Sequence, residues 1–288
     1  MSARVLDGKA VAASVKDEVS VAVAGLDYQP GLATVLVGDD PASHTYVRGK
    51  RRDAGEVGIA SIHHELPETT SQAELTQVIQ SLNDDEAVDG ILVQLPLPGD
   101  LNGEEAVEMI DPAKDVDGLH PFSLGLLMLG RPGLRPCTPS GVMRLLDYYG
   151  IGTAGARAVI VGRSFLVGRP LAMLLSERGA DATVSVAHSR TTDLVSVTAQ
   201  ADILVAAVGV PGLIGREHVK PGATVIDVGV NRTDEGLVGD VDFADVSEIA
   251  GAITPVPGGV GPMTRAMLLA NTLRAAEARR GKLERNRG

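Results

Sequence analysis

Cysteine is almost absent from this chain, since Cys137 is the only one among 288 residues. A single thiol excludes an intrachain disulfide and fits a reducing compartment. The N-terminal segment MSARVLDGKAVAASVKDEVS mixes acidic and basic residues and has no apolar core, which argues against a secretory signal and against a mitochondrial one. We therefore expect a cytoplasmic protein.

Long apolar runs and an excess of positive charge are also missing. No apolar stretch is long enough to span a bilayer, so we expect no membrane segment. The 26 Lys and Arg residues are outnumbered by 37 Asp and Glu residues, which gives a formal net charge of -11. A surface this acidic repels nucleic acid and anionic lipid. A small anionic ligand stays compatible, because it needs only a local cluster of donors.

The patterns of metal and nucleophile sites are missing as well. His63, His64 and the other histidines lack the spacing of metal ligands, and we expect no metal site. No serine, histidine and aspartate occur with the spacing of a nucleophile elbow. Cys137 lies between Pro136 and Pro139, and we interpret it as a small packed residue rather than a nucleophile.

The first half of the chain predicts helices that alternate with strands. Apolar residues recur every four positions from Val11 to Val23, as in an amphipathic helix. Ser43 is the expected N-cap of the next helix, and Ser71 with Glu74 forms a capping box for the one after it. Strands are predicted at residues 32–37, 59–66 and 90–95. This alternation is typical of a parallel sheet.

A second series of strands and helices begins at Thr138 and Pro139, which suit a helix N-terminus. Its apolar strands are typical of parallel strands buried on both faces, at residues 158–161, 183–187, 203–208 and 224–228. After the segment TPVPGGVGPMT, a final helix from Thr264 to about Arg279 is expected to return to the first domain. The length and the 44% hydrophobic content suit two such globular domains. We expect an α/β protein with domains at residues 1–137, completed by residues 264–288, and 138–263.

The second domain opens with the strand AVIV, a glycine turn and a helix. The turn runs from Gly162 to Gly168 and has Ser164 where the usual G-x-G-x-x-G pattern has its second glycine. Glycine permits the tight turn, and free N–H groups at the helix start bind phosphate. Taken alone, the turn is explained equally well as a structural feature. With its neighbours it predicts a Rossmann-like dinucleotide-binding domain.

The end of the next strand favours NADP over NAD. NAD-binding domains place an Asp or Glu there, whereas this chain has His188, Ser189 and Arg190. A carboxylate repels the extra phosphate of NADP, while Ser and Arg bind it. We predict that Ser189, Arg190 and Arg163 surround the ribose phosphate and that Val230 also contacts the cofactor. The alternative for Arg190 is a solvated surface charge.

Two residues in the first domain lie on a helix face of their own. Tyr46 and Lys50 are four residues apart and share this face. Val47, Ala54 and Val57 form the stripe that suits the core. Tyr46 and Lys50 are therefore predicted to face something other than the domain core, although surface positions explain the pair alone equally well.

Polar residues also occur near the predicted strand ends of this domain. Gln94 interrupts the apolar segment ILVQLPLP near the carboxyl end of a strand, where ligands of α/β sheets collect. A structural hydrogen bond to a nearby loop is the alternative. The loop KDVDG places Asp115 and Asp117 beside Gly118. Turn chemistry explains one of these aspartates, less easily both.

Six segments of the chain resemble the bifunctional methylenetetrahydrofolate dehydrogenase/cyclohydrolase family. They occur in the family's order and span almost the whole chain: VGDDPASHTYVRGK, DGILVQLPLP, PAKDVDGLHP, RPCTPSG, VGRSFLVGRP and TPVPGGVGPMT. The segments VQLPLP and PVPGGVGPMT are long and specific enough to argue against chance.

The resemblance implies a homodimer that oxidises 5,10-methylenetetrahydrofolate with NADP and hydrolyses the product to 10-formyltetrahydrofolate. It makes the first domain the folate-binding catalytic domain. By analogy, Lys50 is the catalytic lysine, Tyr46 lies against the folate, Gln94 tunes Lys50 and Asp117 binds the pterin ring. It also implies that Pro257, Gly258 and Gly259 close over folate and nicotinamide.

Three other functions are compatible with parts of this pattern. They are a dehydrogenase without hydrolase activity, a two-domain NADP dehydrogenase of the shikimate type, and a regulatory protein that binds NADP without catalysis. The pair of Lys50 and Gln94 distinguishes the first two from a bifunctional enzyme. A regulatory protein needs none of Tyr46, Lys50, Gln94 and Asp117 to bind NADP, so their joint presence argues against it.

Overall fold

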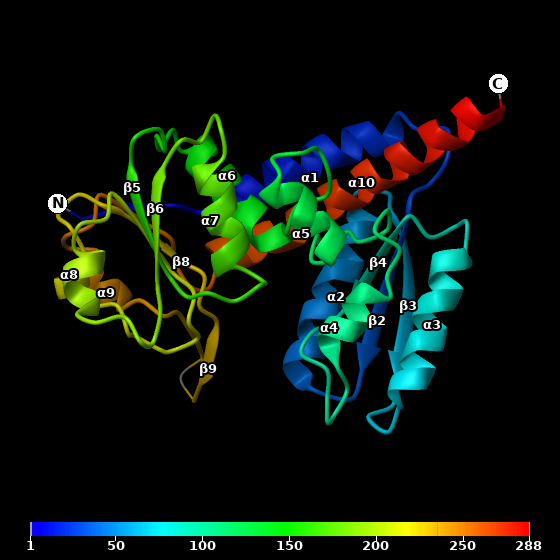
Figure 1. Ribbon diagram of the computed structural model, residues 1–288, viewed down its shortest axis with the longest axis horizontal. Coiled ribbons are helices and arrows are strands. Elements are labelled where there is room, and N and C mark those ends of the chain that lie inside the picture. Colours follow the sequence, from blue (N-terminus) through cyan, green and yellow to red (C-terminus); the bar gives the residue numbers. More distant parts are fainter. Residues whose placement is uncertain (1, 235, 288) are drawn as a thin grey trace. The chain divides into compact units, whose positions relative to one another are not determined.

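The computed structural model describes residues 2–234 and 236–287, which divide into two compact units (Figure 1). The three-stranded unit comprises residues 14–137 and the chain from Arg265 onward, and the six-stranded unit comprises residues 2–13 and 138–264. Each unit has its own parallel sheet. The predicted two-domain α/β architecture is confirmed.

The sheet of the three-stranded unit has the order β3-β2-β4. β2 (Gly31–Val37) is central and buried along its whole length, as its apolar sequence GLATVLV requires. It pairs in parallel with β3 (Ala60–Leu66) and β4 (Gly90–Val93). The carboxyl ends of these strands therefore meet at one edge of the sheet.

Helices α2 (Pro41–Glu56) and α3 (Gln72–Asp84) flank this sheet (Figure 1). The capping box of Ser71 and Glu74 at the start of α3 is confirmed. The prediction that Ser43 caps α2 is wrong by three residues, because Asp40 is the N-cap and accepts the Ser43 N–H at 2.7 Å. Asp is as good a cap as Ser, and a proline after it already has the first-turn backbone angle.

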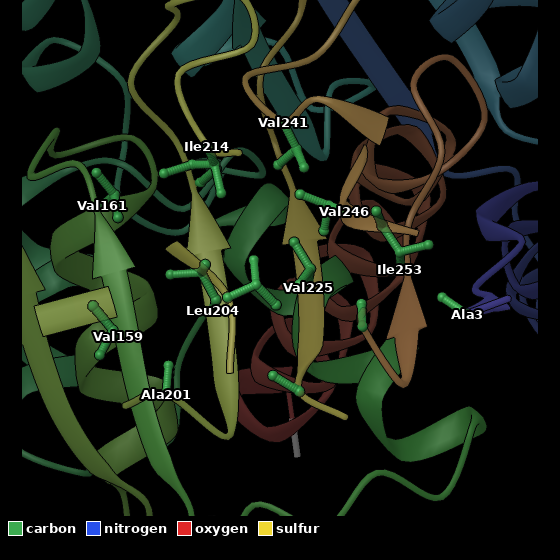
Figure 2. Close-up of a cluster of buried hydrophobic side chains, with 14 of the residues drawn as sticks. Ala3, Val159, Val161, Ala201, Leu204, Ile214, Val225, Val241, Val246 and Ile253 are labelled. Atoms are coloured by element: carbon green, nitrogen blue, oxygen red, sulfur yellow. The ribbon is translucent and has the colours of Figure 1, made fainter. Parts of the chain in front are cut away.

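The sheet of the six-stranded unit has the order β1-β11-β8-β7-β5-β6, all strands being parallel. The strands are β1 (Arg4–Val5), β5 (Arg157–Val161), β6 (Thr183–Ala187), β7 (Ile203–Ala206), β8 (Thr224–Asp227) and β11 (Ala252–Ile253). Side chains of β5, β7, β8 and β11 pack together in one apolar core (Figure 2). β6 does not fit the prediction of strands buried on both faces, because it lies at the sheet edge and Val186 is 40% exposed.

The first residues of the chain join the second half of it. Arg4 and Val5 pair with Ala252 and Ile253, so β1 extends the six-stranded sheet. The sequence places this segment in a domain of residues 1–137, and the structure instead groups residues 2–13 with residues 138–264. A two-residue strand has too short a pattern to reveal its partner from sequence.

Two long helices each have residues in both units. α1 (Gly8–Ala24) buries Val11, Val15, Val19 and Val23, as its four-residue period predicts. α10 (Val260–Arg287) begins four residues before the predicted start, since Pro262 is tolerated in its first turn. From Arg265 onward it belongs to the three-stranded unit, where Asn271 Nδ2 donates to the carbonyls of Val116 and Arg135. The predicted return of the last helix is confirmed.

Shorter elements complete the two units. They are α4 (Gly103–Glu108), α5 (Pro121–Met128), α6 (Cys137–Tyr148), α7 (Gly168–Ser176), α8 (Leu194–Thr198), η1 (Arg216–His218), β9 (Asn231–Thr233), β10 (Gly236–Val238) and α9 (Phe243–Val246). Among the described residues, no helix is both long enough and apolar enough to cross a membrane.

Candidate active site

Helix α2 carries a lysine that is buried away from the apolar core stripe. Val47 and Ala54 are fully buried in the core, as predicted. Lys50 is only 8% exposed, and its Nζ donates a hydrogen bond of 3.0 Å to Oε1 of Gln94. Tyr46, one turn earlier on the same face, is partly buried. The structure thus brings Lys50 and Gln94, predicted from separate segments, into direct contact.

Gln94 is held in one orientation by its surroundings. It follows β4, and its backbone N–H donates to the Val35 carbonyl at 2.9 Å. Its side-chain Nε2 donates to the Leu95 carbonyl at 2.6 Å, which leaves Oε1 to accept from Lys50. The amide therefore positions the amine without carrying a charge of its own.

The two aspartates of the loop KDVDG have different roles in the structure. Asp115 is committed to the loop, since its carboxylate accepts hydrogen bonds from the backbone N–H groups of Gly118, Leu119 and His120 and from the Ser123 hydroxyl. Asp117 is partly exposed, and its carboxyl group lies near the Cys137 thiol and Lys50. Asp115 is the turn residue, and Asp117 is the carboxyl group left for a ligand.

Burial shifts the pKa values of Lys50 and Asp117 in opposite directions. Burial lowers the pKa of Lys50 below its ordinary 10.5, and the neighbouring Asp117 opposes this shift. Burial also raises the pKa of Asp117 above 3.8, against the attraction of Lys50. Each effect favours the neutral form of the group in question. An uncharged amine near neutral pH is the form that accepts a proton.

A further residue at this site, Arg265, has no signal in the sequence. It comes from α10, and its charge also lowers the pKa of Lys50. Its Nε donates to Oδ2 of Asp53 at 2.7 Å, and Asp53 is only 2% exposed. Asp53 and Arg265 lie far apart along the chain, so only the fold reveals their pairing.

Cys137 is a packed residue, as interpreted from the sequence. It is 1% exposed, and its thiol donates to the Val116 carbonyl at 3.2 Å. Burial raises the pKa of this thiol well above its ordinary value, so the thiolate is disfavoured. The structure gives Cys137 no features of a nucleophile.

The glycine turn of the six-stranded unit is built for close backbone approach. A Cβ on Gly162 would lie 2.2 Å from the Ala207 carbonyl oxygen, and one on Gly168 would lie 2.1 Å from the Gly162 oxygen. Gly162 also has a φ of +131°, which other residues avoid. Ser164 closes the turn by accepting the Val167 N–H at 3.1 Å. The serine thus has the role of a turn residue, whatever else it binds.

The start of α7 suits an anion. Its N-cap, Val167, provides no side-chain hydrogen bond to the first turn of the helix. N–H groups at such an uncapped helix end bind phosphate readily, aided by the helix dipole. The turn and the helix start together fit the diphosphate of a dinucleotide.

The residues predicted around the ribose phosphate lie at the ends of neighbouring strands. Val161 of β5 pairs with Ala187 of β6, so the segments that follow the two strands start side by side. Arg163 follows the first strand and Ser189 with Arg190 the second, and all three are exposed. Val230, also predicted to contact the cofactor, lies after β8 and is 44% exposed.

The late loop with Pro257, Gly258 and Gly259 belongs to the six-stranded unit. The bond between Val256 and Pro257 is cis, and Gly258 has a φ of +112°. A Cβ on Gly259 would lie 2.6 Å from the Pro255 carbonyl oxygen, so only glycine fits there. The predicted site residues are therefore divided between the units, with Tyr46, Lys50, Gln94 and Asp117 in the three-stranded one.

Two family models match the chain. The catalytic domain of tetrahydrofolate dehydrogenase/cyclohydrolase matches residues 6–117, and the NAD(P)-binding domain of the same family matches residues 136–280. The chain belongs to this family. The catalytic-domain match contains Tyr46, Lys50, Gln94 and Asp117, and the NAD(P)-binding match contains the glycine turn.

Whole proteins of the family are similar over nearly the full length. The bifunctional protein FolD of Acidiphilium cryptum is 59% identical over 281 residues, which cover 97% of this chain and 100% of that protein. The crystal structure of the bifunctional enzyme FolD from Campylobacter jejuni superposes with a TM-score of 0.93 at 48% identity, covering 96% of this chain and 100% of that one. The Trypanosoma brucei FolD structure, complexed with NADP cofactor and inhibitor, gives 0.92 at 41% identity, covering 96% and 98%.

Proposed function

We propose that this tetrahydrofolate dehydrogenase/cyclohydrolase oxidises 5,10-methylenetetrahydrofolate with NADP and then hydrolyses the methenyl product to 10-formyltetrahydrofolate, with Lys50 as the base of the second step. The observation that carries the assignment is the buried Lys50 amine held by Gln94. A structural lysine buried at this cost in desolvation donates to several backbone acceptors, as Lys114 does to three carbonyls, whereas Lys50 donates, among the described residues, only to the neutral Gln94 amide.

The oxidation step asks the protein mainly to orient its reactants. A bound NADP would supply the hydride acceptor for the methylene carbon of the folate. The glycines of the turn and the uncapped start of α7 would hold the diphosphate, and the Pro257–Gly259 loop would contact folate and nicotinamide. Holding two rings at reactive distance supplies much of the rate enhancement for such a step.

Hydrolysis of the cationic methenyl bridge requires a group that takes a proton from water. Lys50 at its ordinary pKa would be charged and unable to do so near pH 7. Its burial and the nearby Arg265 charge lower that pKa, and a bound methenyl cation would lower it further. Gln94 then keeps Nζ in one position while the proton moves.

Asp117 is proposed to bind the pterin ring. Ring N–H groups of a pterin donate to a carboxyl group, and this one is not consumed by the loop, unlike Asp115. Lys50 lies close enough to Asp117 to oppose the rise of its pKa, so the amine helps to keep the carboxylate available as an acceptor. Tyr46, on the same helix face as Lys50, is proposed to stack against the folate.

Preference for NADP over NAD is part of the proposal. No carboxylate side chain follows β6 in the segment His188-Ser189-Arg190, and two arginines, Arg163 and Arg190, are exposed at the neighbouring strand ends. This arrangement favours the ribose phosphate over a free hydroxyl. Equal catalytic efficiency with the two cofactors would contradict it.

A homodimer and a cytoplasmic location complete the proposal. The first rests on the resemblance to the family and the second on the scarcity of cysteine. Sedimentation equilibrium of the purified chain tests the dimer, for which we expect twice the 29.8 kDa chain mass.

One assay separates the proposed function from its alternatives. Purified protein is mixed with methylenetetrahydrofolate and NADP, and NADPH formation and methenyl turnover are followed together. We expect both signals, with the methenyl intermediate consumed faster than it hydrolyses in buffer. NADPH formation with methenyl accumulation would indicate a dehydrogenase alone, and neither signal would indicate a binding protein.

A further inference from the structure

Three polar side chains converge at the carboxyl edge of the three-stranded sheet, apart from the residues discussed above. Asp39 follows β2, His44 lies in the first turn of α2 and Glu65 lies near the end of β3. One ligand atom from each lies within 4.8 Å of the other two. His44 Nε2 is 3.6 Å from Asp39 Oδ1 and 4.0 Å from Glu65 Oε1.

These separations are close to those of a bound metal ion. Bonds of about 2.0–2.2 Å in a tetrahedron place neighbouring ligand atoms about 3.3–3.6 Å apart. The two separations from His44 are within about half an ångström of this range, and the Asp39 and Glu65 oxygens, which lie within 4.8 Å, need to approach by up to about 1.5 Å. The side chains have the freedom to do so. The Asp39 side chain is 94% exposed and the Glu65 side chain 54%.

Glu65 also contacts His63, which is itself held by a hydrogen bond to Thr34. His63 Nε2 is 3.5 Å from the other carboxylate oxygen of Glu65, Oε2. The second ring nitrogen of His63 is 3.1 Å from the hydroxyl of Thr34, which is 1% exposed. Partners of this kind fix the direction of ligating side chains in metal sites.

The charge of the cluster favours a cation over an anion or a neutral ligand. Two carboxylates meet one imidazole, so the cluster is negative even when the imidazole is protonated. The positive end of the α2 dipole opposes a cation, but the N-cap Asp40 carboxylate offsets it. Imidazole selects first-row transition metals over magnesium and calcium, which prefer all-oxygen ligands.

We propose that Asp39, His44 and Glu65 bind one divalent ion of the zinc and cobalt class, with water at the remaining positions. The three ligands come from three separate segments, which is why the spacing of histidines along the sequence predicts no metal site. A bound ion would link the first turn of α2 to the end of β3 through its bonds to His44 and Glu65. His44 is two residues before Tyr46, so the ion steadies the helix end that carries the folate-facing residues.

Calorimetric titration of the full chain with zinc chloride tests this site. We expect one ion per chain for the wild type, and a loss of affinity of at least about 10-fold in His44→Gln and in Glu65→Gln. His64→Gln is the matched control, because His64 is on the same strand but its side chain points to the opposite face. It should bind zinc as the wild type does.

The same variants provide the contradicting outcomes. Unchanged zinc affinity in both His44→Gln and Glu65→Gln, or an equal loss in His64→Gln, overturns the site. Displacement of zinc by a tenfold excess of magnesium overturns the ion class. Cobalt absorbance gives a second readout, since a bound imidazole and two carboxylates in tetrahedral geometry intensify its visible bands. Circular dichroism of each variant confirms that the fold is retained.

Discussion

Two buried lysines of the three-stranded unit show how hydrogen-bond partners decide a side chain's role. Lys114 is 1% exposed and its Nζ donates to three carbonyls, those of Leu82, Asn83 and Asp85. Lys50 Nζ instead donates to the neutral Gln94 amide. Burial lowers the pKa of both amines. Lys114 needs all three of its protons to satisfy its partners, whereas Lys50 keeps its hydrogen bond after losing one.

Replacement of Lys50 by Met should remove the base and leave the apolar stem. We expect hydrolysis of methenyltetrahydrofolate to fall by at least about 100-fold, the contribution typical of a positioned base. The hydride step should respond differently, because it needs orientation rather than a proton acceptor. Arg51→Met, on an exposed neighbouring position of α2, is the control. Hydrolysis at the wild-type rate in Lys50→Met would locate the base elsewhere.

Gln94→Leu should change the pH dependence of hydrolysis. The Gln94 oxygen accepts a hydrogen bond from Lys50, and it stabilises the ammonium more than the amine. Without it, the pKa of Lys50 falls further. The midpoint of the rate-against-pH curve should move down by up to about 1 unit. A curve with the same midpoint removes Gln94 from the tuning of Lys50.

At the scale of elements, the C-terminus of α3 depends on a side chain from a distant loop. The last carbonyls of a helix lack intrahelical partners, and Lys114 supplies them. Lys114→Met should lower the free energy of unfolding by about 1–3 kcal/mol, because it leaves the buried Leu82 carbonyl and two part-buried carbonyls without their donor. Denaturant unfolding measures this. Lys220→Met, which breaks only an exposed ion pair with Asp202, should cost less than about 1 kcal/mol.

The glycine turn between β5 and α7 and the end of β6 together set the cofactor preference in our proposal. Arg190→Ala should raise the KM for NADP about 10-fold, as expected for one charge-assisted contact at an exposed site. The KM for NAD should change little, because NAD lacks the ribose phosphate. Steady-state kinetics with both cofactors measures the two effects. A parallel change in both would show a structural role for Arg190.

Helix caps and hydrophobic periodicity, which lie within a few residues, predicted most helices and strands. Features that depend on contacts between distant segments could not be predicted. The capping box of Ser71 and Glu74 is complete within four residues, so its pattern alone located α3. The start of α2 was misplaced because Asp40 and Ser43 are both good caps and local preference does not rank them. The exposure of β6 depends on the strand order, which an apolar segment does not encode.

The candidate site also has residues that the sequence predicts and contacts that only the fold reveals. The sequence predicts four site residues, because each stands out locally or matches a family segment: Tyr46, Lys50, Gln94 and Asp117. The pairing of Arg265 with Asp53, and the hydrogen bonds that commit Asp115 to its loop, come from contacts that only the folded chain makes. The residues that support the candidate site through long-range contacts therefore have no signal in the sequence.

At the scale of the whole molecule, pH should change stability through a buried carboxyl group. Asp227 is 3% exposed and accepts the backbone N–H groups of Gly229, Asp240 and Val241. Asp240 in turn accepts the N–H groups of Val208 and Gly209. These two side chains hold the segments after β7 and β8 together. Because Asp227 is buried and lies near the Asp240 carboxylate, a negative charge on Asp227 is unfavourable.

Burial, together with the Asp240 charge, raises the pKa of Asp227 from 3.8 to about 6, against the three N–H donors. Between these values the folded chain binds a proton that the unfolded chain has released, so the free energy of unfolding falls as pH rises from about 4 to 6. A shift of this size corresponds to about 3 kcal/mol. Asp227→Asn should flatten this part of the curve in urea unfolding, whatever its effect on absolute stability. Asp147→Asn, at a carboxylate that is 79% exposed, should keep the wild-type slope, and a loss of slope there would place the titrating group elsewhere.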